Sequence, residues 1–138
     1  MANRKSTAVW KGSSRDGSGT VRLGSGVFEG AYDWRSRFEN GSTTNPEELI
    51  AAAHAGCFSM ALASDLTKAG HIPTRIETSA EVMMDENNTI TSVVLSTEAQ
   101  VPDIDQKTFI EIAEGAKKNC PVSKALRALE ITLTARLL

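Results

Sequence analysis

The sequence predicts an α+β protein with mainly antiparallel sheets around one long, buried central helix. Short apolar segments separated by Gly and Ser fill residues 1–45, a long apolar segment follows, and stretches of alternating polarity then flank two further helical patterns. The resulting order is strands, one long helix, a hairpin, two helices and a final strand, which lacks the strand–helix alternation of a doubly wound fold. With 138 residues, we expect a single domain over residues 1–138.

The N-terminal segments are typical of a meander of short strands. We predict these strands at residues 7–11, 19–23, 26–29 and 35–38. Glycines at positions 17, 19, 24 and 26 do not form a GxGxxG phosphate loop, because position 22 is an arginine and no helix begins there. We therefore interpret them as turn glycines.

The central helix is predicted over residues 45–69 by its end signals. Asn45 can cap the first turn, Pro46 suits the first helical position, and Glu48 stands where a capping-box acid would be. Gly70 then provides a typical helix end.

The middle of this helix is apolar on every side. Between residues 49 and 63 the only polar side chains are His54 and Ser59. A helix of this kind has to be buried all round, and one small domain can hardly enclose it alone. We therefore expect a homodimer with a large apolar interface.

The C-terminal half continues with strands of period two and two shorter helices. Asp105 is the expected cap of the first of these helices, and Pro102 ends the strand before it. The predicted elements are strands at 75–84, 91–101 and 130–137 and helices at 106–118 and 121–128.

Composition argues against several classes of protein. Fifteen Lys and Arg against seventeen Asp and Glu give a net charge of -2, and no basic run is present, which argues against nucleic-acid binding. No uninterrupted apolar run reaches the length of a membrane span, and no apolar stretch follows the first basic residues as in a secretory signal. We expect a cytoplasmic protein, in which a purely structural disulfide between its two cysteines is disfavoured.

The two cysteines can be interpreted as inert buried thiols or as a redox pair. Gly56 directly precedes Cys57, so the helix could kink there, and a fresh helix start would favour the thiolate; alternatively Gly56 only lets another helix pack closely. His54 is either a base for Cys57 or a buried, hydrogen-bonded histidine. Cys120 precedes Pro121 at a helix start, where free N–H groups face its sulfur. No metal-binding spacing is present.

Two long motifs resemble the family of osmotically inducible protein C and the organic hydroperoxide resistance proteins, OsmC/Ohr. They are residues 44–62 (TNPEELIAAAHAGCFSMAL) and residues 120–126 (CPVSKAL). Residues 10–12 (WKG) and 37–39 (RFE) are closer to the OsmC branch. The resemblance runs from about residue 10 to the last strand.

The resemblance implies a thiol-dependent peroxidase that reduces organic hydroperoxides to alcohols, in an intertwined homodimer with active sites at the subunit interface. By position, Cys57 matches the peroxidatic cysteine and Cys120 the resolving cysteine. Arg37 matches the active-site arginine, although Arg35 lies two residues away, and Glu47 matches the orienting carboxylate. No bound cofactor is expected; the implied reductant is a dithiol such as a protein-bound lipoyl group.

The chemistry needs these residue types. A buried thiol stays protonated unless a cation such as the guanidinium of Arg37 stabilises the thiolate, and Glu47 would balance that cation. A straight helix separates Glu47 from Cys57 by about 15 Å, so we predict a helix break near Gly56, unless Arg37 itself spans most of the gap.

The expected cycle forms a Cys57 sulfenic acid and then a Cys57–Cys120 disulfide, which a dithiol reduces. Phe58, Met60 and Leu62 would favour alkyl or fatty-acid hydroperoxides over hydrogen peroxide. The alternatives are a non-catalytic protein that senses peroxide through the same cysteines and a structural dimer with inert thiols.

Overall fold

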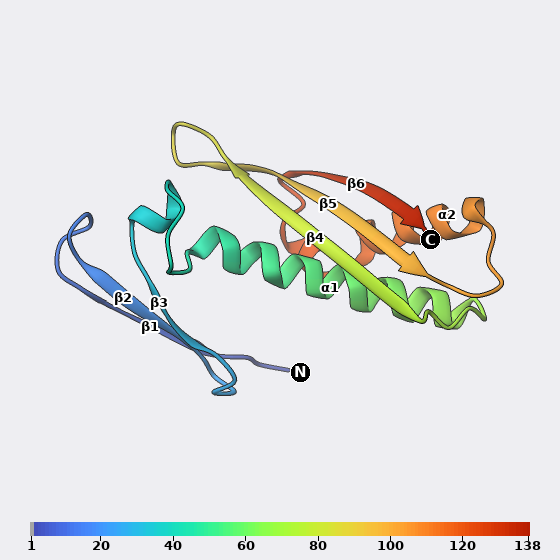
Figure 1. The fold of residues 1–138 in the computed structure, drawn as a ribbon, viewed down its shortest axis with the longest axis horizontal. Coiled ribbons are helices and arrows are strands. Elements are labelled where there is room, and N and C mark those ends of the chain that lie inside the picture. The colour runs from blue at the N-terminus through green and yellow to red at the C-terminus, as the bar shows by residue number, and fades with distance from the viewer. Residues whose placement is uncertain (1) are drawn as a thin grey trace. The chain divides into compact units, whose positions relative to one another are not determined.

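The computed structural model describes residues 2–138, which divide into two compact units, residues 2–49 and residues 50–138. Each unit holds one three-stranded sheet, and a long helix, α1 (Pro46–Lys68), begins in the first unit and runs through the second. The predicted α+β class and the order of the elements are confirmed (Figure 1). Whether residues 1–138 act as one domain stays a prediction.

The first unit is an antiparallel meander of β1 (Ser6–Lys11), β2 (Ser18–Leu23) and β3 (Glu29–Tyr32). The third strand begins three residues later than the start predicted for it. Gly19 is not a turn glycine: it lies in β2 opposite Tyr32, and any Cβ there would collide with the tyrosine ring. Gly26 is one, with a φ of +78° in the β2–β3 turn.

The predicted strand at residues 35–38 is wrong, because the chain forms a 3-10 turn, η1 (Arg35–Arg37), in its place. The carboxylate of Asp33 accepts the Ser36 N–H at 2.8 Å, and the Ser36 hydroxyl donates to the Asp33 carbonyl at 2.9 Å. These local bonds satisfy the backbone inside the turn, so it needs no neighbouring strand.

The sheet of the second unit has the order β4-β5-β6, with β4 (Arg75–Met84), β5 (Ile90–Gln100) and β6 (Glu130–Leu137). β4 and β5 form the predicted antiparallel hairpin, whereas β6 joins β5 in parallel. A parallel pair requires a long crossover connection, and here it contains α2 (Gln106–Asn119) and α3 (Pro121–Ala125).

The core of the second unit lies between one face of this sheet and the two longer helices, α1 and α2. α1 contributes a stripe of fully buried side chains spaced four residues apart: His54, Phe58, Leu62 and Leu66. Val93, Leu95 and Ala99 of β5 and Phe109, Ala113 and Ala116 of α2 complete the contact. Each large apolar side chain buried in this way stabilises the fold by about 1.5–3 kcal/mol.

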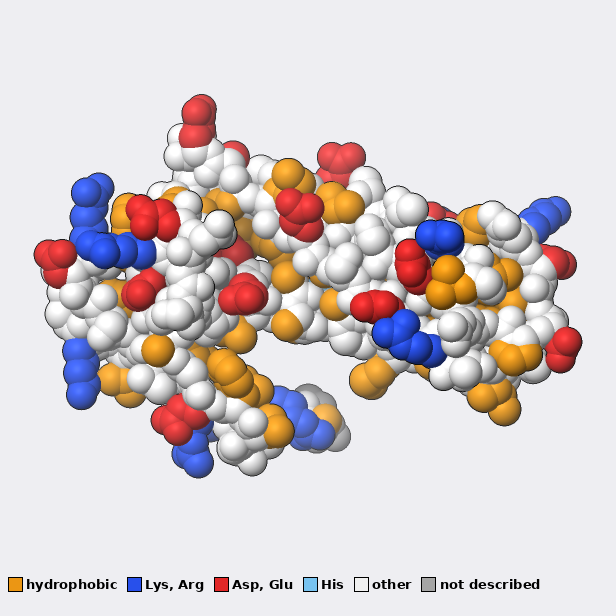
Figure 2. Space-filling model, viewed as in Figure 1, with side chains coloured by type: hydrophobic (Ala, Val, Ile, Leu, Met, Phe, Trp, Pro, Cys, Tyr) orange, Lys and Arg blue, Asp and Glu red, His pale blue; other side chains and the backbone are white. Residues whose placement is uncertain are grey.

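The remainder of α1 is not buried in the single chain. Met60 is 75% exposed, and Gly56 is exposed on the side away from the core stripe. Hydrophobic side chains also reach the surface over both units in the face shown in Figure 2. The length and apolar composition of α1 would suffice to cross a membrane, but the core helices of globular proteins meet the same two criteria.

Candidate active site

Arg37 is held at the start of α1 by a network that ties η1 to the helix. Asn45 caps α1 by accepting the Glu48 N–H at 2.8 Å, as predicted, and its side-chain amide donates to the Ser36 carbonyl at 2.9 Å. The Ser36 hydroxyl also lies 2.7 Å from the Thr44 carbonyl. The helix cap therefore fixes the turn that carries Arg37.

Arg37 and Glu47 form an ion pair, with 3.0 Å between Nε of the arginine and Oε1 of the carboxylate. The side chains are 31% and 14% exposed, so both are largely shielded from water. Arg35, the alternative candidate, lines a different pocket with Arg15 and Asp16. Of the two arginines, Arg37 is thus the one that the carboxylate orients.

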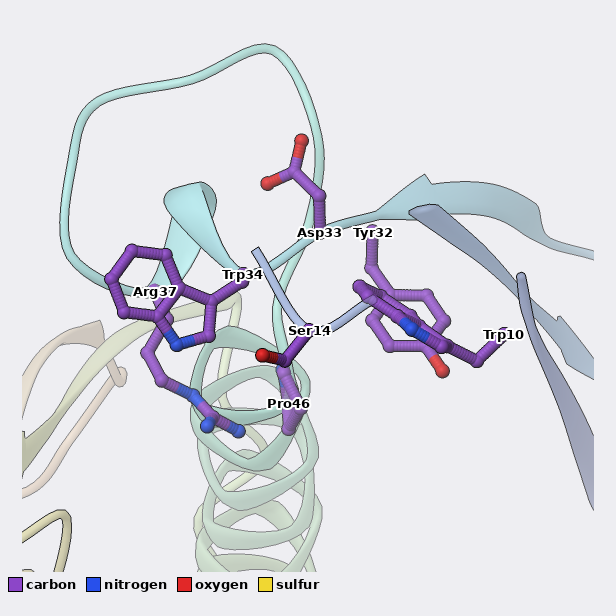
Figure 3. Close-up of a pocket in the computed structure, with 7 residues that line it drawn as sticks. All are labelled: Trp10, Ser14, Tyr32, Asp33, Trp34, Arg37 and Pro46. Carbon is purple, nitrogen blue, oxygen red and sulfur yellow. The ribbon is translucent and has the colours of Figure 1, made fainter. Parts of the chain in front are cut away.

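Arg37 also borders an apolar pocket of about 160 Å³ within the first unit (Figure 3). Aromatic rings dominate its wall: the Trp10 and Tyr32 rings are 5.4 Å apart, and Trp34 lies next to the arginine. The pocket is lined by Trp10, Ser14, Tyr32, Asp33, Trp34, Arg37 and Pro46. A guanidinium at the edge of an aromatic cavity can hold a polar group while the rings contact an apolar one.

Cys57 lies on α1, which is helical without interruption through Gly56. The predicted break is therefore wrong, and so is the fresh helix start that would have favoured the thiolate. One glycine destabilises a helix by only about 1 kcal/mol, which the buried contacts of His54 and Phe58 on either side offset. A Cβ at Gly56 would meet no atom within 4 Å, so close packing against another segment of the described residues does not explain it either.

Cys120 lies at the junction of α2 and α3 and is fully buried. It ends α2 and caps α3, with its sulfur accepting the Ser123 N–H at 3.3 Å. This is the position that the Cys120-Pro121 dipeptide predicts, since proline at the first helical position leaves the preceding residue as the cap.

The two thiols are free and are neighbours in the second unit. Burial raises the pKa of the Cys57 thiol above its ordinary value. The Val122 N–H opposes that rise, and the adjacent Cys120 side chain adds to it. None of these influences on the Cys57 pKa is a cation, so a cation has to be supplied if Cys57 is to act as a thiolate.

Of the two interpretations of His54, a base for Cys57 or a buried, hydrogen-bonded histidine, the structure matches the second. Its Nε2 lies 2.7 Å from the Ser123 hydroxyl, and burial lowers its pKa below the ordinary value. Sequence reasoning missed Ser123, although a hydroxyl three residues after a helix-capping cysteine faces that sulfur and could have been found from the CPVS pattern.

The structure thus brings the four predicted residues together as two pairs. Arg37 and Glu47 form one pair in the first unit, and Cys57 and Cys120 form the other in the second. Over residues 2–138 no cluster of His, Cys, Asp and Glu side chains is suited to hold a metal ion.

Fold and site together define a small α+β protein in which a free thiol on the long helix α1 neighbours a second free thiol at the α2–α3 junction. Comparison with known proteins gives the family. The model of the OsmC-like protein family matches residues 39–135, and the chain belongs to this family.

Named relatives agree with that assignment. The chain is 48% identical to "Peroxiredoxin OsmC" of Escherichia coli, over 98% of this chain and 96% of that protein. It is 32% identical to "Organic hydroperoxide resistance protein OhrB" of Bacillus subtilis, over 64% of this chain and 66% of that protein. The resemblance to the OsmC branch is confirmed.

A solved structure has the same fold. The organic hydroperoxide resistance protein from Elizabethkingia anophelis superimposes with a TM-score of 0.77 and 25% identity, covering 100% of this chain and 98% of that chain.

Proposed function

We propose that this protein is a thiol peroxidase that reduces organic hydroperoxides to alcohols. The observation that carries the proposal is the pair of free, adjacent thiols, one partly exposed on α1 and one fully buried at the α2–α3 junction. The names of the relatives, a peroxiredoxin and organic hydroperoxide resistance proteins, support a peroxidase role.

In the proposed cycle the Cys57 thiolate attacks the outer oxygen of the hydroperoxide. The O–O bond breaks, the alkoxide leaves and takes up a proton, and Cys57 becomes a sulfenic acid. The Cys120 thiol then attacks the Cys57 sulfur, which yields a disulfide and water. A dithiol, which the family resemblance suggests to be a protein-bound lipoyl group, reduces the disulfide by exchange.

In the proposed mechanism, the guanidinium of Arg37 stabilises the thiolate form of Cys57. Burial opposes the charged form, and lowering the thiol pKa by three units takes about 4 kcal/mol of differential stabilisation. A shielded guanidinium can supply an interaction of this size, and the same group can stabilise the departing alkoxide. Glu47 keeps the guanidinium in one orientation by accepting from its Nε at 3.1 Å.

We place this chemistry in a homodimer. α1 buries only one stripe in the single chain, and every residue of β1 is exposed, so apolar surface remains for a second copy. Mixed dimers of Cys57→Ser and Arg37→Met chains test which subunit supplies the arginine. Recovery of activity on mixing means that Arg37 acts across the interface, and continued inactivity means that it acts within its own chain.

The substrate is expected to carry an apolar group, although not for the reason the sequence suggested. Phe58 and Leu62 are fully buried in the core and cannot contact a substrate. The aromatic pocket beside Arg37 is the better candidate, because its walls are largely apolar and the guanidinium stands at its edge. Alkyl and aryl hydroperoxides should therefore react faster than hydrogen peroxide.

The decisive experiment follows consumption of cumene hydroperoxide in the presence of a dithiol. Cys57→Ser should abolish turnover, and unchanged turnover would refute the proposal. In a second assay without any external thiol, Cys120→Ser should complete one turnover and then stall. A peroxide sensor would oxidise once and stop even with dithiol present, whereas inert thiols would consume no peroxide.

A further inference from the structure

A chain of buried hydrogen bonds leads away from Cys120. The Cys120 thiol donates to the Ser123 hydroxyl oxygen at 3.2 Å, and this hydroxyl lies 2.7 Å from Nε2 of His54. Cys120 and His54 are fully buried and Ser123 is 4% exposed. Three groups that can each carry a proton thus stand in line, closed off from water.

His54 is an unfavourable residue for the stability of the core at its position. It belongs to the core stripe of α1, whose other members are phenylalanine and two leucines. Its Nδ1 is buried and finds no hydrogen-bond partner within residues 2–138. Burying a polar group without a full set of partners destabilises a protein, so a leucine at this position would pack better. Conflict of this kind between a residue and its surroundings is expected where the residue has a chemical task.

The hydrogen bonds have a consistent direction. Because the thiol of Cys120 donates to the Ser123 oxygen, the hydrogen of Ser123 is free to point at Nε2 of His54. Burial keeps His54 neutral by lowering its pKa, which leaves that nitrogen able to accept. The Ser123 N–H also donates to the Cys120 sulfur, at 3.3 Å, and stabilises the charge that develops there.

We propose that Ser123 and His54 form a proton relay that deprotonates Cys120 when it resolves the Cys57 sulfenic acid. This inference rests on the proposed peroxidase function and assigns how its second step occurs. Ser123 touches the reacting sulfur and is a catalytic residue; His54 acts through Ser123 and is a positioning residue that holds the proton. Bulk water cannot take this proton directly, because Cys120 is completely enclosed.

The step balances without an outside reagent. An electron pair of the Cys120 sulfur forms the S–S bond while the S–O bond of the Cys57 sulfenic acid breaks, so Cys120 is oxidised and Cys57 is reduced. The thiol proton passes to the Ser123 oxygen as the Ser123 hydrogen passes to Nε2 of His54. The departing hydroxide then takes a proton from the Ser123 hydroxyl while Nε2 of the imidazolium returns its proton to the Ser123 oxygen, which leaves one disulfide, one water and the original relay.

The test measures the two oxidation steps separately in the full-length reduced protein after one equivalent of cumene hydroperoxide. Dimedone trapping with mass spectrometry reports the Cys57 sulfenic acid, and non-reducing mass spectrometry reports the disulfide. Ser123→Ala removes the middle of the relay, and His54→Gln keeps a hydrogen-bonding group without a basic nitrogen. Ser59→Ala is the control, since it removes a hydroxyl that lies on α1 outside the relay and donates to the Thr78 hydroxyl at 2.7 Å.

We expect sulfenic acid formation within about twofold of the wild-type rate in all variants, and disulfide formation slowed about 100-fold in Ser123→Ala and His54→Gln. Ser59→Ala should change neither step. Disulfide formation within threefold of wild type in Ser123→Ala would overturn the relay, and so would an equal fall in both steps, which indicates a damaged pocket. If His54→Gln does not fold, Ser123→Ala decides alone. Failure of wild-type Cys57 to form a sulfenic acid refutes the peroxidase function itself, a separate outcome.

Discussion

The ion pair between Arg37 and Glu47 should contribute far more to stability than an exposed pair of the same type. At 3.0 Å and an effective dielectric constant of about 20, the attraction between two unit charges is about 5.5 kcal/mol. Desolvation and the ordering of two side chains remove most of it. Because the side chains are only 31% and 14% exposed, we expect a net coupling of about 1.5 kcal/mol.

The chain supplies its own control. Arg75 and Glu77 form a pair at 3.2 Å whose side chains are 56% and 64% exposed, so we expect a coupling below about 0.5 kcal/mol. Two double-mutant cycles measure both quantities by urea unfolding at one fixed protein concentration, with arginine changed to methionine and glutamate to glutamine in each. Equal couplings in the two cycles would show that shielding of Arg37 and Glu47 adds nothing and would refute the reasoning.

Three further predictions concern the core and the two titratable groups of the second unit. Leu62→Ala should lower the free energy of unfolding by about 3 kcal/mol, whereas Ile72→Ala, at a position 74% exposed, should change it by less than about 0.5 kcal/mol in the same urea assay. Burial lowers the pKa of His54, so on acidification the histidine of the unfolded chain is protonated before that of the folded protein. The contribution of His54 to the free energy of unfolding should be intact above about pH 6.5 and fall by up to about 1.4 kcal/mol per pH unit below it. His54→Gln should abolish this slope. Arg37→Met removes the cation that is proposed to oppose the effect of burial on the Cys57 pKa, so alkylation by iodoacetamide should require a higher pH than in the wild-type protein. Identical pH profiles would contradict the role of Arg37.

Elements with strong local signals were predicted well. Asn45, Pro46 and Gly70 fix both ends of α1, and the residues 46–68 that are helical differ from the prediction by one at each end. The boundaries of β4 and β6 were predicted without error, because a strict alternation of apolar and polar residues indicates a half-buried strand.

Errors arose where local bonding or tertiary contacts decide the structure. Residues 35–37 alternate like a strand, yet side-chain bonds from Asp33 and Ser36 close them into a turn. The break near Gly56 was predicted from the need to join two parts of a site, and the helix does not break because its buried stripe holds it on both sides of the glycine. A functional requirement does not determine local backbone conformation.

The site was predictable in its residue types and less so in its connections. Motif positions singled out Arg37 and Glu47, and the ion pair between them is present in the structure. The contact between His54 and Ser123 joins residues 69 positions apart, and no local pattern reports a hydrogen bond across such a separation. It depends on the way α3 is folded against α1.

The parallel pairing of β6 with β5 has a consequence for the newly made chain. The crossover between β5 and β6 carries Cys120 and Ser123, so it is closed only after β6 has docked beside β5. Before that docking, Cys120 lacks the complete enclosure that the folded second unit gives it. We therefore expect the proposed pairing of the two cysteines to be acquired late in folding, after β6 has paired with β5.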